Sequence, residues 1–135
     1  MRPIRNFALP ASLALTALLL AAPQAAMSQS ATATCSAVKG KNDVTGLTFA
    51  GQAVWKDGET FDFTRLTFNA DCTVTYGYRG GEWNNGRWSQ TAKGVTVDFN
   101  NGFATYTGKR KGKVLSGTMK NVRDESGTWK FTQKP

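Results

Sequence analysis

Apolar and polar residues alternate along the chain from Gly46 onward, and no helical period interrupts the alternation. Val95, Val97 and Phe99 fall on one side of an extended segment, whereas Thr96 and Asp98 fall on the other. The same two-residue period recurs in residues 72–78, 115–119 and 129–131. A period of two with polar residues on one side is typical of antiparallel strands that are covered on one face only.

Turn signals separate these segments every eight to fifteen residues. Asn-Gly and Asp-Gly pairs are frequent among them, and such pairs suit tight hairpin turns because the central residues need positive φ. Residues 80–86, which include Trp83, are interpreted as one long connection. The predicted turns lie at residues 57–58, 69–71, 80–86, 93–94, 101–102, 109–112 and 124–127. Seven turns predict eight strands.

One predicted strand changes phase. Phe61 and Phe63 are odd-numbered, whereas Leu66 and Phe68 are even-numbered, so a β-bulge near residues 64–65 is expected. Short hairpins leave two strand edges unless the sheet closes, and closure removes both edges. We therefore expect an all-β, eight-stranded antiparallel up-and-down β-barrel. The alternative is a sandwich, which would need longer Greek-key connections.

The first residues have the composition of a secretory signal peptide. Arg2 and Arg5 precede an uncharged stretch over residues 7–22, and small residues follow it. Cleavage after Ser28 is preferred, and cleavage after Ala25 or Ala26 is an open alternative. A membrane anchor would need a longer and more apolar run, and the context of Cys35 fits a lipoprotein poorly.

We expect the chain to consist of three parts. We expect a cleaved signal peptide at residues 1–28, a Ser/Thr/Ala-rich leader at 29–45 and one barrel domain at 46–135. The mature protein is expected to be a periplasmic or secreted monomer with no transmembrane segment.

The chain has two cysteines and no histidine. Without histidine, the chain cannot form a Ser-His-Asp or Cys-His catalytic pair or a histidine-ligated metal site. In an oxidising compartment the two cysteines are expected to form one structural disulfide, Cys35–Cys72, which ties the leader to the barrel. A reactive thiol pair would instead favour a Cys-x-x-Cys spacing.

Three segments carry a Gly-x-Trp or Trp-led motif, at residues 52–55, 86–88 and 127–129. With the segments 66–71, 104–108 and 115–119, they make the chain resemble an exported bacterial lipocalin-like family of calycin type. The resemblance implies a small barrel, in a family that includes small-molecule binders, inhibitors of secreted enzymes and a few enzymes. Cys72 departs from the pattern, because it stands where the family usually has the glycine of an Asp-Gly turn.

The aromatic residues are the first candidates for function, because eight strands enclose room for packed side chains or for one small ligand. They could line an open mouth, with Arg87 as a handle for an anion, or simply fill the core. The candidate ligand-binding residues are Trp55, Tyr76, Tyr78, Trp83, Arg87, Trp88, Tyr106 and Trp129.

A basic cluster is the second candidate, in a chain of formal net charge +8. Lys109, Arg110, Lys111 and Lys113 could contact an anionic partner or form a solvated turn. No nucleic-acid partner is expected for an exported protein with one such cluster.

Acid–base catalysis is not expected. The mid-strand carboxylates Asp62 and Asp98 alternate with aromatic or apolar residues and therefore point outward. No enzymatic activity, metal or cofactor is expected. The leading hypothesis is an exported barrel that binds a small hydrophobic or aromatic ligand. The alternative is a protein-interaction module, such as an inhibitor of a secreted hydrolase or an envelope factor, that acts through its rim loops.

Overall fold

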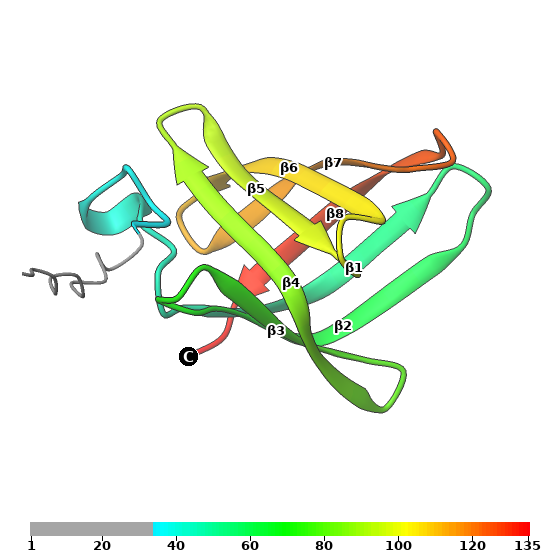
Figure 1. The fold of residues 1–135 in the computed structure, drawn as a ribbon, viewed down its shortest axis with the longest axis horizontal. Helices are drawn as coiled ribbons and strands as arrows, with labels where there is room; N and C mark the ends of the chain where they lie inside the picture. The colour runs from blue at the N-terminus through cyan, green and yellow to red at the C-terminus, as the bar shows by residue number, and fades with distance from the viewer. Residues whose placement is uncertain (1–33) are drawn as a thin grey trace, which may run out of the picture. The chain divides into compact units, whose positions relative to one another are not determined.

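The computed structural model describes residues 34–135, and the predicted signal peptide and the first residues of the leader lie outside this range. A short 3-10 helix, η2 (Gly40–Asn42), precedes eight strands (Figure 1). The strands are β1 (Thr48–Trp55), β2 (Thr60–Phe68), β3 (Thr73–Tyr78), β4 (Gly81–Thr91), β5 (Gly94–Phe99), β6 (Ala104–Lys111), β7 (Val114–Asn121) and β8 (Ser126–Gln133).

The strands form a closed barrel in sequence order, as the turn spacing predicted. Each strand is antiparallel to the next, and β8 closes the barrel by pairing with β1, where Ala53 lies opposite Trp129. Within residues 34–135, no helix is long and apolar enough to cross a membrane. The prediction of an all-β up-and-down barrel is confirmed.

The phase change in β2 is a β-bulge, as predicted. Phe63 and Arg65 pair with adjacent residues of β3, Tyr78 and Gly77, so one extra residue is accommodated at Thr64. The extra residue allows both Phe63 and Leu66 to face the interior, where both are buried.

The long connection predicted at residues 80–86 is wrong. The turn between β3 and β4 spans only residues 79–80, and Trp83 belongs to β4. Gly86 lies inside the strand, where an added Cβ would stand 3.1 Å from the Cβ of Val74. This glycine therefore permits close packing of neighbouring strands rather than a turn. A second bulge near it makes Val74 pair with Gly86 and Tyr76 pair with Trp83.

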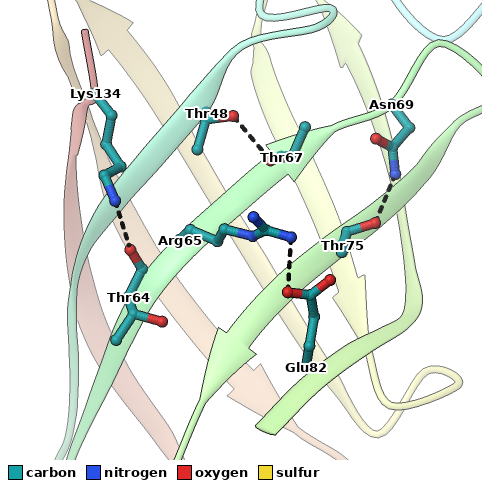
Figure 2. Close-up of polar contacts among 8 residues, drawn as sticks. All are labelled: Thr48, Thr64, Arg65, Thr67, Asn69, Thr75, Glu82 and Lys134. Carbon is teal, nitrogen blue, oxygen red and sulfur yellow. Dashed lines mark hydrogen bonds and ion pairs between the residues drawn. The ribbon is translucent and has the colours of Figure 1, made fainter. Parts of the chain in front are cut away.

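The outer face of the barrel carries polar side chains that bridge neighbouring strands (Figure 2). The Thr48 and Thr67 hydroxyls lie 2.8 Å apart across β1 and β2. Arg65 donates to Glu82 at 2.7 Å, and both side chains are about half exposed. Such exposed pairs are worth at most about 1 kcal/mol, so the stability of the barrel depends mainly on its interior.

One end of the barrel is covered by the leader. This closed end is formed by the connections 69–72, 92–93 and 112–113 together with residues 34–47. Cys35 is bonded to Cys72, with an S–S distance of 2.01 Å, and this confirms the predicted disulfide. Cys72 has φ of 72° and its N–H donates to the carbonyl of Asn69, so it adopts the conformation that a glycine would have in this turn.

Buried Gln90 joins the leader to β4. Its Oε1 accepts from the Ser36 hydroxyl at 3.0 Å and from the Val44 N–H at 3.1 Å. Its Nε2 donates to the carbonyl of Asn42 at 2.7 Å. Because both ends of the amide are paired, this polar side chain fixes the leader without leaving an unsatisfied group in the core.

Candidate ligand-binding site

A cavity of about 310 Å³ lies at the opposite end of the barrel. This open end is formed by the connections 56–59, 79–80, 100–103 and 122–125. Nine of the twelve lining residues are aromatic. The lining residues are Trp55, Phe61, Phe63, Tyr76, Tyr78, Trp83, Asn85, Phe99, Asn100, Phe103, Ala104 and Tyr106.

Phe63 forms the floor of the cavity. Its ring centroid lies 5.5 Å from that of Phe99, 5.9 Å from that of Tyr76 and 6.3 Å from that of Tyr106. The β2 bulge places Phe63 there, because without the extra residue Phe63 and Leu66 would face opposite sides of the sheet. A ring with neighbours on several sides is a rigid apolar surface against which a flat molecule can pack.

Trp83 is the most exposed aromatic residue of the wall, with 39% of its surface accessible. Its ring is stacked against that of Tyr76, with centroids 6.1 Å apart, and it also contacts Tyr78. The guanidinium of Arg79 lies 5.0 Å from the Tyr78 ring centroid and pairs with Glu59 at 3.4 Å. The guanidinium of Arg123 lies 5.6 Å from the centroid of Phe103, another ring of the lining. The entrance is therefore aromatic, with two arginines over its rings.

The polar groups of the cavity are few. The Tyr76 hydroxyl donates to Oδ1 of Asn85 at 2.6 Å, and Nδ2 of Asn85 lies 3.5 Å from Oδ1 of Asn100. Burial raises the pKa of the Tyr76 and Tyr78 hydroxyls. Burial also raises the pKa of Tyr106, strongly, and the neighbouring Tyr78 and Tyr76 add to the effect. All three phenols therefore stay protonated at neutral pH.

Five of the eight candidate ligand-binding residues lie together around this cavity. They are Trp55, Tyr76, Tyr78, Trp83 and Tyr106. They come from β1, β3, β4 and β6, which shows that the cavity is built by strands distant in the sequence.

The other three candidates do not line the cavity. Trp88 is packed at the closed end, where its ring lies 5.2 Å from that of Phe68. Trp129 is buried and its Nε1 donates to the carbonyl of Thr118 at 2.8 Å. Arg87 is exposed on the outer face, opposite Asp98 in the β4–β5 pair, and is not a handle at the mouth.

Seven lining residues were not among the sequence candidates. Phe61, Phe63 and Phe99 fall on the inward-facing side of their strands by the two-residue alternation, and this alternation is the signal that would have added them. Asn85 lay in the predicted connection 80–86, and Asn100 lay next to the predicted turn at 101–102. Phe103 and Ala104 had no distinguishing signal.

The basic cluster lies at the closed end, in the β6–β7 hairpin. Arg110 is fixed within the structure, because it donates to the carbonyl of Asp43 at 3.1 Å and to the side chain of Gln133 at 2.7 Å. Lys109, Lys111 and Lys113 are exposed. The four residues are therefore not equivalent, and Arg110 helps to hold the leader.

The two mid-strand carboxylates lie outside the cavity. Asp62 is exposed and accepts from Nε2 of Gln52 at 2.7 Å, and Asp98 accepts from the Thr105 hydroxyl at 2.7 Å. Among residues 34–135, no group of three or more potential metal-ligating side chains is present. The cavity thus offers packing surface and phenolic hydroxyls.

The fold and the cavity define the class of this protein as a closed eight-stranded up-and-down β-barrel with an aromatic cavity at one end. No protein-family model, curated protein or solved structure matches the chain. The barrel is consistent with the lipocalin-like fold that the sequence motifs predicted, and membership of that family stays a prediction.

Proposed function

We propose that this protein is an exported binding protein that holds one small aromatic or hydrophobic ligand in the cavity at its open end. The observation that carries the proposal is the cavity itself, lined mainly by aromatic rings. Ligand sites are typically concave and apolar, of about 300–1,000 Å³, with a few polar groups. A volume of about 310 Å³ lies at the small end of that range and suits a ligand of one or two rings.

The distribution of charge supports binding rather than catalysis. None of the described residues that line the cavity carries a formal charge. A general acid or base must lie within hydrogen-bond reach of its substrate, and Asp62 and Asp98 do not line this cavity. The disulfide fits the proposed export to an oxidising compartment.

The test is equilibrium dialysis of the mature protein against 2-ethylnaphthalene, an uncharged two-ring probe. We expect saturable binding at one site. Trp83→Ala should weaken it about tenfold, because the wall loses a stacked ring. Val122→Ala is the matched control: Val122 is 71% exposed in the connection 122–125 but does not line the cavity, so binding should be unchanged.

Two results would count against the proposal. The first is the absence of saturable binding by the wild-type protein. The second is equal loss of binding in the Trp83 and Val122 variants, which would point to the surface of the open end. The alternative of a protein-interaction module acting through these loops would then be the better account.

A further inference from the structure

Tyr106 carries a buried hydroxyl that has no partner in the described part of the chain. The residue is only 2% exposed and lines the cavity. Its ring is held between Phe99, at a centroid distance of 4.7 Å, and Trp129, at 5.8 Å. Within residues 34–135, its hydroxyl makes no hydrogen bond, whereas the Tyr76 hydroxyl in the same cavity is bonded to Asn85.

An unpaired hydroxyl at this depth calls for an explanation. Buried polar groups are nearly always hydrogen-bonded, and a group left unpaired is destabilising. Phenylalanine would fill the same space without that penalty. A tyrosine that lines a cavity, and whose hydroxyl has no partner among residues 34–135, is therefore suited to bond whatever occupies the cavity.

The surroundings define the chemistry of that occupant. The phenol stays protonated at neutral pH, so its O–H is a donor, and a partner that satisfies this donor carries an acceptor atom. Among residues 34–135, no cation lines the cavity to balance a buried anion. Arg79 lies over the Phe61 and Tyr78 rings and is paired with Glu59, and Arg123 lies over the Phe103 ring without lining the cavity. An ionised group on the floor would lose its hydration without compensation. The acceptor is therefore an uncharged oxygen or nitrogen.

We propose that the ligand is a flat, uncharged aromatic molecule with a hydrogen-bond acceptor, which packs against Phe63 and Trp83 and accepts a hydrogen bond from the Tyr106 hydroxyl. This inference rests on the proposed binding function and makes it more specific. Tyr106 is the residue that selects for the acceptor, and the surrounding rings supply affinity for the flat skeleton.

The experiment compares two probes that share a ring system, 2-acetylnaphthalene, which carries a carbonyl acceptor, and 2-ethylnaphthalene, which lacks it. The measured quantity is the ratio of their dissociation constants in wild-type protein and in Tyr106→Phe. In Tyr106→Phe we expect the preference for the acetyl probe over the ethyl probe to be about three- to tenfold smaller than in the wild type, which is the usual contribution of one hydrogen bond. Binding of the ethyl probe should be retained.

Tyr76→Phe is the matched control. It removes a hydroxyl from the same cavity, but one already bonded to Asn85, so the ratio should stay within about twofold of wild type. A third probe, 2-naphthoate, places a carboxylate at the same position and should bind more weakly than 2-acetylnaphthalene at neutral pH. Thermal unfolding of each variant establishes that the barrel is intact.

The outcomes separate the two proposals. If the wild-type protein binds neither uncharged probe, the binding function fails and the inference fails with it. If both probes bind but Tyr106→Phe leaves their ratio unchanged, the binding function stands and the inference is overturned. Tighter binding of 2-naphthoate than of the acetyl probe would overturn the uncharged class, and an equal change of the ratio in Tyr76→Phe would remove the special role of Tyr106.

Discussion

Two tryptophans on strand β4 allow the same substitution to be tested at both ends of the barrel. Trp88 lies at the closed end and is 4% exposed, whereas Trp83 lines the cavity and is 39% exposed. We expect Trp88→Ala to affect stability with little effect on the cavity. Trp83→Ala should have the reverse effect.

The magnitudes follow from the contacts of the two rings. Trp88 packs edge-on against Phe68 and its Nε1 donates to the carbonyl of Asn69 at 2.8 Å. Its removal leaves a cavity and takes one of two donors from that carbonyl, which keeps the Cys72 N–H. Replacing a buried tryptophan by alanine costs about 3–5 kcal/mol. For a domain of this size that corresponds to a fall in Tm of about 15–25 °C. Trp83 has solvent on one side, and its loss should cost about 1 kcal/mol.

The assay is urea unfolding of the two variants and the wild type with the disulfide intact, followed by dialysis of the folded proteins against 2-ethylnaphthalene. A stability loss below about 1 kcal/mol for Trp88→Ala would contradict the assignment of Trp88 to the core. A loss of similar size for both variants would contradict the division between a closed end and an open end. If Trp88→Ala weakened binding of the probe by the folded protein as much as Trp83→Ala does, the probe would not be reporting on this cavity.

Three further predictions concern buried groups and the disulfide. Replacing both cysteines by alanine should lower the free energy of unfolding by about 4 kcal/mol in the chain-entropy model for a separation of 37 residues, measured in urea. Gln90→Leu should lower it by about 2 kcal/mol or more, because the Val44 N–H loses its buried acceptor and the Asn42 carbonyl loses its donor, and thermal unfolding will show whether it does. Burial raises the pKa of Tyr106 above its ordinary 10.0, so its contribution is fully present below pH 10 and is lost as pH rises further. Above pH 10 the free energy of unfolding should fall by about 1.4 kcal/mol per pH unit because of this residue, and this part of the fall should be absent in Tyr106→Phe. The measurement is unfolding of both proteins at a series of alkaline pH values.

The barrel could be predicted well because the sequence signals that define it lie close together along the chain. Alternation identifies the face of each strand, and the turn signals delimit the strands. Even the bulge at Thr64 was predictable, because Phe63 and Leu66 can both face the core only if one residue is added between them.

The site was less predictable because alternation does not say at which end of the barrel an inward-facing residue lies. Trp88 and Trp83 are both inward-facing residues of β4, yet only Trp83 reaches the cavity. The difference depends on the β3–β4 register and on the bulge near Gly86, and the Asn85-Gly86 pair has the same composition as a hairpin turn. Pairing between strands decides which role such a dipeptide takes.

The two ends of the barrel differ in how they are filled. At the closed end, the leader supplies a disulfide, the paired Gln90 amide and buried Val44, so that end is filled and fixed. At the open end no described segment covers the aromatic rings, and Tyr106 lines the cavity with a hydroxyl that has no partner among residues 34–135. A small barrel has too little interior to leave room for a ligand throughout its length. Concentrating the stabilising contacts at one end allows the other end to remain hollow, and it explains why substitutions on a single strand are expected to separate folding from binding.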